Sequence, residues 1–238
     1  MRRGQGGTVS EDEVARFDAL ADRWWDPDGP MRPLHRMNPL RTEWVDARIR
    51  RRAGGPVRVL DVGCGAGLLS EALAKRGHEV LGLDAAGAAL AAARAHAEGQ
   101  SLALSYRDGL AEELLAEGVR FPAITALEVI EHVPDPAGFV GTLARLLEPG
   151  GSLFLSTLNR TPRSFLVAKL GAEYVLRWLP VGTHDWRKFL TPREAGALLR
   201  GAGLRVTDIA GMTLDPLSGR WKAGRNVSVN YIVQAVAG

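Results

Sequence analysis

The residues whose types and spacing could do chemistry follow one short apolar run, residues 57–60. Asp61 ends this run, and glycines stand at positions 63, 65 and 67 before a helical pattern begins. A glycine has no Cβ, so a ligand can approach its backbone closely. The first N–H groups of a helix lack partners within the helix and can face that ligand. A buried strand, a tight turn and a helix start therefore predict a ligand site here.

The spacing of the glycines indicates which ligand this turn suits. A dinucleotide site needs G-x-G-x-x-G, whereas Gly63, Gly65 and Gly67 give G-x-G-x-G, which counts against a nicotinamide-dependent oxidoreductase. The carboxylate of Asp61 would repel a pyrophosphate but suits a ligand with an ammonium and a sulfonium group. Asp84 ends the next apolar run about 20 residues later, where an acid takes ribose hydroxyls. The D-x-G-x-G-x-G pattern resembles the first motif of class I S-adenosylmethionine (SAM) methyltransferases.

A second group of reactive side chains follows the apolar run 123–127, namely Glu128, Glu131 and His132. Open α/β sheets bind ligands at the carboxyl ends of their strands, and this turn lies at such an end. Two carboxylates and an imidazole suit Mg²⁺, Mn²⁺ or Zn²⁺. The alternative is a cluster at a helix start with His132 solvated, and the residues alone leave both open. Without a metal, His132 or His184 is the candidate general base.

Length and composition restrict the class of protein. The chain has 238 residues, 46% of them hydrophobic, which fits one globular domain with additions. A net charge of +3 does not by itself indicate nucleic-acid binding, so we expect no nucleic-acid partner. The single cysteine, Cys64, rules out an internal disulfide. No apolar run approaches the ~18 residues of a membrane span, and the N-terminus lacks a secretory signal, so bacterial cytoplasm is the expected location.

The elements that position these side chains predict a Rossmann-like α/β fold. We expect a mostly parallel seven-stranded sheet with helices on both faces. The strands are expected at residues 57–62, 79–83, 102–106, 123–127, 152–157, 204–209 and 226–236, with turns at residues 148–151 and 215–219. Residues 57–238 form the main domain in this scheme, with an insertion at residues 159–188.

Residues 1–56 are expected to form an N-terminal helical extension and lid. Helical spacing predicts an amphipathic helix from Ser10 to Trp24 and a second helix from Thr42 to Arg52. Between them, residues 31–41 contain prolines and no periodicity, which predicts an irregular segment. This segment is either a solvated loop or a lid that lays Arg41 near the SAM carboxylate as a charge-assisted pair.

The insertion contains a helical pattern at residues 164–179 that is apolar around most of its surface. Its polar positions form one narrow stripe of Lys169, Glu173 and Arg177. Such a helix is either buried or lies in a membrane interface. Its basic residues and terminal aromatics favour the membrane interface. The alternative is a lid helix over a substrate pocket, and the two readings are compatible.

Together these segments resemble the ubiquinone biosynthesis O-methyltransferase family, over about residues 14–231. The glycine motif is generic, but two segments, residues 35–41 and 157–160, are specific to this family. The matching segments are Arg16-Phe17, Arg23-Trp24-Trp25-Asp26, Pro33-Leu34-His35-Arg36-Met37-Asn38-Pro39-Leu40-Arg41, Leu60-Asp61-Val62-Gly63-Cys64-Gly65, Glu131-His132-Val133-Pro134-Asp135-Pro136, Ser156-Thr157-Leu158-Asn159-Arg160, Gly171-Ala172-Glu173-Tyr174 and Gly182-Thr183-His184-Asp185.

The resemblance implies a SAM-dependent enzyme that methylates phenolic hydroxyls of polyprenylated precursors, 2-polyprenyl-6-hydroxyphenol and 3-demethylubiquinol. It implies SAM contacts at Arg41, Gly63, Asp84 and Leu127, the last replacing a methionine of some members. In members that use a divalent metal, such as Mg²⁺, the ligands match Glu128, Glu131 and His132.

The resemblance also implies where the protein works and with what. The inserted helix matches a segment implicated in membrane association, which places the protein at the inner face of the bacterial plasma membrane. Association with other enzymes of the ubiquinone pathway is compatible with this placement. The competing hypotheses are a methyltransferase for another small phenolic or lipid-like acceptor, and a non-catalytic protein that binds membrane surfaces.

Overall fold

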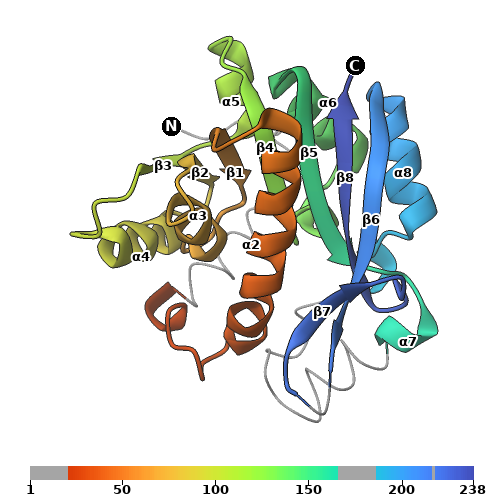
Figure 1. Cartoon of the computed structure of the whole chain (residues 1–238), viewed down its shortest axis with the longest axis horizontal. Coiled ribbons are helices and arrows are strands. Elements are labelled where there is room, and N and C mark those ends of the chain that lie inside the picture. Colours follow the sequence, from red (N-terminus) through yellow and green to blue (C-terminus); the bar gives the residue numbers. More distant parts are fainter. Residues whose placement is uncertain (1–20, 166–185, 216–217) are drawn as a thin grey trace.

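Eight strands form one sheet in the computed structural model, which describes residues 21–165, 186–215 and 218–238. Helices cover both faces of this sheet (Figure 1). The strands are β1 (Arg58–Val62), β2 (Glu79–Asp84), β3 (Leu104–Asp108), β4 (Phe121–Leu127), β5 (Leu147–Leu158), β6 (Leu204–Leu214), β7 (Trp221–Gly224) and β8 (Asn230–Ala237). The α-helices are α2 (Arg32–Ala53), α3 (Leu68–Ala74), α4 (Gly87–Ala97), α5 (Ala111–Ala116), α6 (Pro136–Leu146), α7 (Pro162–Ser164) and α8 (Pro192–Gly201). Short 3-10 helices are η1 (Ala21–Arg23), η2 (Ile130–His132) and η4 (Trp186–Lys188).

The strand order is β3-β2-β1-β4-β5-β8-β6-β7. The first five strands of this order are parallel, and β8 pairs antiparallel with both β5 and β6. Because the carboxyl ends of the parallel strands meet at one edge, Asp61, Asp84 and Glu128 come to the same edge of the sheet. The expected Rossmann-like architecture is confirmed, with one strand more than the seven predicted.

The additional strand is β7, which forms a hairpin with β6. The predicted turn at residues 215–219 lies at this hairpin, where the backbone N–H of Asp215 donates to the Arg220 carbonyl at 2.9 Å. Residues 216–217 lie outside the described part. The four residues of β7, Trp-Lys-Ala-Gly, show no alternation of polarity, so the pattern gave no signal for a strand. Tertiary contact supplies the stabilisation, because Trp221 packs against the apolar cluster under α2.

The segment 31–41, predicted to be irregular, is instead the first half of α2. Pro33 lies in the first turn, where a backbone N–H would have no partner within the helix. Pro39 lies inside the helix with its ring exposed to solvent, so one backbone hydrogen bond is lost without a steric conflict in the core. Packing of the buried residues of α2 against the sheet outweighs this local cost.

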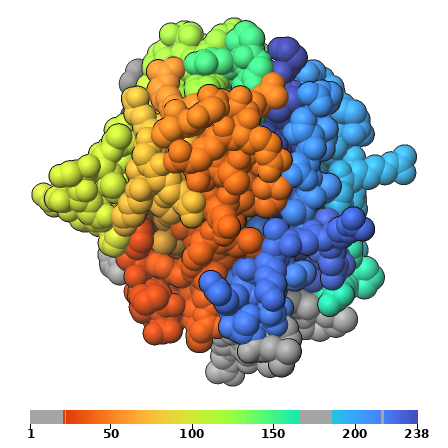
Figure 2. Space-filling view, viewed as in Figure 1, coloured from red at the N-terminus to blue at the C-terminus, as the bar shows by residue number. Residues whose placement is uncertain are grey.

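Helix α2 lies across one face of the sheet (Figure 1), and its flank is visible at the centre of Figure 2. Its Met37, Trp44, Val45 and Ile49 form an apolar cluster with α3 and with residues of β1, β4, β5 and β8. The opposite face carries a larger cluster that joins α5, α6 and α8 to the strands. The sheet is therefore buried on both faces, as its near-continuous apolar strands indicate.

Polar contacts hold the second half of α2 in register with the sheet. The buried carboxylate of Asp46 lies 2.9 Å from Nε2 of the fully buried His78 and 3.0 Å from a guanidinium nitrogen of Arg76. Arg48 donates to Asp208 of β6 at 2.9 Å. These contacts tie α2 to the segment before β2 and to β6.

Two further expectations differ in detail from the structure. Residues 148–151, predicted to be a turn before the fifth strand, lie inside β5 as an irregularity in its pairing with β4. Gly150 has a φ of +74°, which only glycine adopts easily. Most of the predicted helix 10–24 lies outside the described residues, and its end is the short turn η1.

Within the described part, no helix is both long and apolar enough to cross a membrane.

Candidate active site

The glycine loop between β1 and α3 adopts the backbone that its sequence predicts. Gly63, Gly65 and Gly67 have φ values of +68°, +54° and +86°, in the left-handed region that favours glycine. A Cβ on Gly65 would lie 2.5 Å from the Trp24 ring, and one on Gly63 would lie 2.4 Å from Val129. Glycine is therefore required here both by conformation and by space.

A strap formed by Trp24 and Trp25 lies on this loop, which the sequence did not indicate. The indole N–H of Trp25 donates to the Ala66 carbonyl at 3.0 Å. The Trp25 ring stacks on His96 of α4 with a centroid distance of 3.4 Å and an angle of 4°. His35 of α2 lies 2.7 Å from the Trp24 carbonyl. The loop is thus enclosed between α2, α4 and the strap.

Asp84 ends β2 beside the glycine loop, as predicted. Its two carboxylate oxygens accept the backbone N–H groups of Gly65 at 2.7 Å and Ala86 at 2.8 Å. Each carboxylate oxygen can accept more than one hydrogen bond. Asp84 can therefore hold the loop and still accept a hydroxyl group from a ligand.

Asp61 is buried, with only 3% of its surface exposed. Its carboxylate accepts the hydroxyls of Ser70 and Thr125, each at 2.6 Å. Burial raises the pKa of Asp61 to about 6, although these two hydroxyls and nearby Arg41 favour the charged form. The sequence predicted Asp61 as a site residue but gave no sign of its two hydroxyl partners.

The raised pKa of Asp61 predicts a pH dependence of stability. Its pKa is about 3.8 in the unfolded chain and about 6 in the folded protein, so the folded state binds the proton more tightly between these values. The resulting stabilisation is complete below pH 4 and is lost as the pH rises through 6. We expect Asp61→Asn to remove this loss, which amounts to about 3 kcal/mol.

Urea unfolding of the ligand-free protein at several pH values between 4 and 8 measures this effect. The wild type is expected to lose free energy of unfolding relative to Asp61→Asn as the pH rises. A difference between the two proteins that is the same at every pH would contradict the assignment, because other titrating groups contribute equally to both.

Arg41 of α2 is also buried, with 4% of its surface exposed. Its Nε has no hydrogen-bond partner among the described residues. Burial lowers the pKa of Arg41, and the negative charges of Glu128 and Asp61 only partly offset this. A buried guanidinium without a bound anion is costly, and a carboxylate on a ligand would pair with it.

Glu128 and Glu131 meet just beyond the end of β4. Glu128 has a φ of +58°, rare for a residue with a side chain, and it accepts the Ser156 hydroxyl at 2.6 Å. Glu131 is buried, and its Oε2 has no hydrogen-bond partner among the described residues. Burial and the adjacent Glu128 raise the pKa of Glu131 well above its ordinary value, so this pair tends to hold a proton.

The predicted metal ligands are only partly brought together. No cluster of three or more His, Cys, Asp or Glu side chains among the described residues is arranged to hold a metal ion. Glu128 and Glu131 interact directly, but half-buried His132 does not complete a three-residue set with them. The metal site therefore stays a prediction.

Two predicted features lie outside the described residues. His184 is one, and residues 166–179 of the predicted helix 164–179 are the other. Their flanks are described: Trp186 donates its indole N–H to the Thr161 carbonyl at 3.1 Å, and Phe165 contacts the Trp186 ring. The two ends of the insertion therefore come together beside the end of β5.

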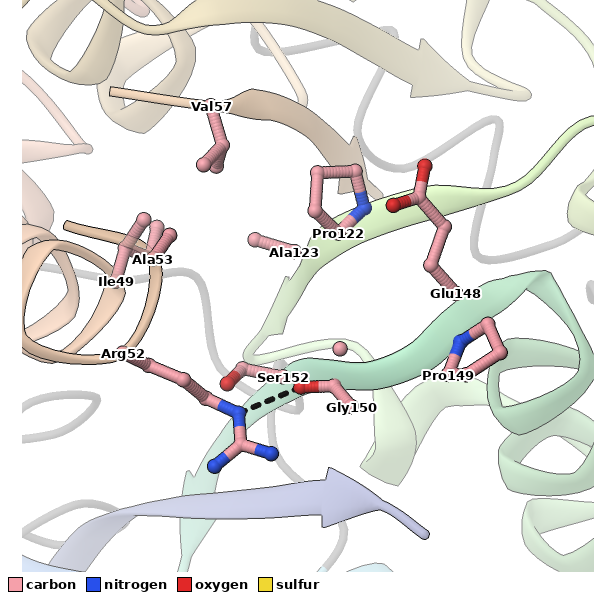
Figure 3. A pocket seen from close by; sticks show the side chains of 11 residues that line it. Ile49, Arg52, Ala53, Val57, Pro122, Ala123, Glu148, Pro149, Gly150 and Ser152 are labelled. Atoms are coloured by element: carbon pink, nitrogen blue, oxygen red, sulfur yellow. Dashed lines mark hydrogen bonds between the residues drawn. The ribbon is translucent and has the colours of Figure 1, made fainter. Parts of the chain in front are cut away.

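A cavity of about 110 Å³ lies at the opposite edge of the sheet, where the strands begin (Figure 3). The last turn of α2 forms one wall, and Arg52 donates to the Gly150 carbonyl at 2.5 Å across its mouth. Pro122 and Glu148 come from the starts of β4 and β5. None of the predicted site residues lines this cavity, so it is separate from the site at the carboxyl edge.

Comparison with known proteins identifies the family. The family described as "Methyltransferase domain" matches residues 33–209. A ubiquinone biosynthesis O-methyltransferase of Pseudomonas aeruginosa is 50% identical over 228 residues, covering 95% of this chain and 97% of the relative. The chain belongs to the ubiquinone biosynthesis O-methyltransferase family. One from Dinoroseobacter shibae is 47% identical and covers 96% of both chains.

Solved structures agree with this family fold. A SAM-dependent methyltransferase from Aquifex aeolicus has a TM-score of 0.63 at 17% identity, covering 94% of this chain and 98% of its own. Magnesium protoporphyrin IX methyltransferase from Synechocystis, solved with bound SAM, has a TM-score of 0.61 at 18% identity. The match covers 98% of this chain and 100% of that one. As a member of the ubiquinone biosynthesis O-methyltransferase family, the protein is a SAM-dependent methyltransferase with the class I fold.

The residues present fit SAM as the methyl donor. A buried cation and a buried acid, Arg41 and Asp61, complement the carboxylate and ammonium of an amino-acid end. The glycine loop has the positive φ values that its motif requires, and Asp84 lies beside it at the end of β2. Leu127 is half-buried at the end of β4, within the cluster beneath α2.

Proposed function

We propose that this protein transfers the methyl group of SAM to a phenolic hydroxyl on a polyprenylated ring of ubiquinone biosynthesis. The acceptors predicted are 2-polyprenyl-6-hydroxyphenol and 3-demethylubiquinol. The observation that carries the proposal is about 50% identity to ubiquinone biosynthesis O-methyltransferases over nearly the whole chain. The buried Arg41, whose Nε lacks a partner, and the backbone conformation of the glycine loop support the donor half of the reaction.

We assign each predicted contact of the donor a role. Arg41 binds the carboxylate of SAM, and Asp61 favours its ammonium. Gly63 and Gly65 let the donor lie against the loop, and Asp84 accepts the ribose hydroxyls. Leu127 packs against the adenine. The role of Leu127 rests on the family resemblance, and the other roles are supported by side-chain chemistry and by position at the carboxyl edge of the sheet.

The protein must also make the acceptor oxygen nucleophilic. SAM, when bound, supplies an electrophilic methyl group on a sulfonium. A phenol has a pKa near 10, so little of it is ionised at neutral pH. We propose His132 as the general base that takes the phenolic proton, with His184 as the alternative from the insertion. His132 ends η2, five residues after the end of β4, and is next to Glu131 in the sequence.

Membrane association is the second part of the proposal. An isoprenoid tail keeps the acceptor in a bilayer, so the enzyme must meet the ring at the membrane surface. The apolar residues of the segment 164–179 support a peripheral location at the inner face of the plasma membrane. The same segment is the candidate lid over the acceptor. Association with other enzymes of the pathway remains compatible with this location.

The first experiment is methyl transfer from labelled SAM to a short-tailed demethylubiquinol. We expect labelled methyl ether as product. SAM binding without transfer to this acceptor or to a short-tailed 2-polyprenyl-6-hydroxyphenol would contradict the proposed acceptors and favour another small phenol. Absence of both binding and transfer would favour a non-catalytic membrane-binding protein.

The same assay tests the predicted metal. Transfer is measured with EDTA and after adding back Mg²⁺ or Zn²⁺. Activity that stops with EDTA and returns with metal would support a metal site formed by Glu128, Glu131 and His132. Activity indifferent to EDTA would exclude a readily removed metal and leave the proton to a histidine.

A further inference from the structure

The carboxyl edge of the sheet holds more buried polar atoms without hydrogen-bond partners than contacts with SAM would satisfy. Six side-chain atoms here are buried without a hydrogen-bond partner among the described residues. They are Asn38 Oδ1, Arg41 Nε, Glu131 Oε2, Asn159 Oδ1, Ser228 Oγ and Asn230 Oδ1. Unsatisfied buried polar atoms are rare and costly, and a concentration of them at a ligand site indicates groups that a ligand satisfies.

The order of the strands separates these atoms into two groups. The glycine loop and Asp84 place the donor over β1 and β2, on one side of β4. The acceptor must then approach from the other side of β4, where β5 and β8 lie. Asn159 and Asn230 lie on that side, because Asn159 follows β5 and Asn230 begins β8.

Asn230 lies on the same face of the sheet as the donor site. It pairs with Leu158 in the antiparallel ladder, and its Nδ2 lies 3.6 Å from the sulfur of Met37 on α2. Arg41 is one helical turn beyond Met37, so Met37 and Arg41 share a face of α2. Asn230 and Arg41 therefore both lie on the side of the sheet that α2 covers.

The acid pair is linked to the same face of the sheet through Ser156. Ser156, which donates to Glu128, precedes Leu158 by two residues on β5. Residues two apart on a strand lie on one face at a spacing of about 7 Å. Because Asn230 pairs with Leu158, Ser156 and Asn230 lie on the same face of the sheet, two residue pairs apart along the β5–β8 ladder.

The backbone around Asn230 is held firmly. The backbone N–H of Asn159 donates to the Val229 carbonyl at 2.8 Å, and its side chain donates to the Val227 carbonyl at 2.8 Å. The hydroxyl of Thr161 donates to the Ser228 carbonyl at 2.5 Å. Only 4% of Asn230 is exposed. A ligand would thus meet an amide whose position is already determined.

We propose that Asn230 binds the methyl acceptor through the oxygen substituent next to the hydroxyl that is methylated. This inference rests on the proposed function. A carboxamide both donates and accepts hydrogen bonds. It can therefore accept from a neighbouring hydroxyl or donate to a neighbouring methoxy oxygen. Asn230 is in this view a residue that selects phenols with an ortho oxygen.

The test compares two short-tailed acceptors, one a catechol and the other a phenol without the ortho oxygen. The wild type is expected to prefer the catechol in kcat/KM. Asn230→Leu, which has a similar volume, is expected to reduce this preference about tenfold, because one buried hydrogen bond is lost. The loss should appear for the catechol, while the Kd for SAM measured by calorimetry stays unchanged.

The matched control is Gln234→Leu, which removes another buried amide from the same face of β8. Gln234 donates to Ser152, away from the carboxyl edge. The preference of the Gln234→Leu variant for the catechol should therefore equal that of the wild type. If Asn230→Leu does not fold, Asn230→Ala takes its place, and Tm values establish folding.

The outcomes separate this inference from the proposed function. A wild type that methylates neither acceptor overturns both. A wild type that methylates the catechol, with an Asn230 variant that keeps the wild-type preference, overturns the role of Asn230 alone. An equal loss of preference in the Gln234 variant would also overturn it, because the effect would then come from general damage to β8.

Discussion

His132→Gln is expected to lower kcat about 100-fold while the Kd for SAM stays unchanged. The reason is that a phenol with a pKa near 10 must lose its proton as the methyl group is transferred, and general bases contribute at least this much. Glutamine retains the size and polarity of the side chain but cannot take the proton. Steady-state kinetics with a short-tailed demethylubiquinol measures the effect.

A second acceptor distinguishes a role of His132 as general base from a purely structural role. A nitro-substituted catechol has a hydroxyl that is largely ionised at neutral pH, so it needs no base. Its methylation by His132→Gln should approach the wild-type rate. An equal loss on both acceptors would contradict the role as base and, if EDTA also stops the wild type, would favour metal ligation instead.

Arg41→Met is expected to raise the Kd for SAM about 100-fold. The guanidinium is buried, and its Nε has no partner in the ligand-free protein. A carboxylate that pairs with it would form a desolvated ion pair, and losing one side of such a pair costs about 3 kcal/mol. Isothermal titration calorimetry measures the change.

The stability of this variant provides an independent check. The Tm of ligand-free Arg41→Met establishes that the variant is folded, although loss of the guanidinium leaves the nearby carboxylates of Asp61 and Glu128 without this cation. The rise in Tm on adding saturating SAM should shrink. Arg51→Met is the control, because Arg51 is exposed near the end of the same helix. An unchanged Kd for Arg41→Met would remove Arg41 from the donor site.

Several parts of the fold could be predicted because they depend on local pattern. Asp61, the three glycines that follow it and the helix after them are read from a run of adjacent residues. The backbone conformation of such a turn depends on which residues tolerate a positive φ, and all three glycines adopt one. The parallel order of β1 to β5 also follows from alternating strands and helices.

The prediction was wrong where tertiary packing outweighed local preference. Pro33 and Pro39 indicated an irregular segment, yet both are accommodated in α2 because one lies in the first turn and the other faces solvent. Strand β7 has no alternating pattern, yet it forms because Trp221 packs under α2. Local propensity is a weak preference, and burial of a large apolar surface exceeds it.

By itself, the sequence determined the residue types of the proposed donor site: an acid, a glycine turn and a second acid at one edge of a parallel sheet. The tertiary structure decided which distant side chains complete that site. The Trp24 ring covers Gly65, Ser70 and Thr125 bind Asp61, and Asn230 comes to the side of α2 that carries Arg41. These contacts depend on strand register and helix packing between segments far apart in the chain, which no local pattern encodes.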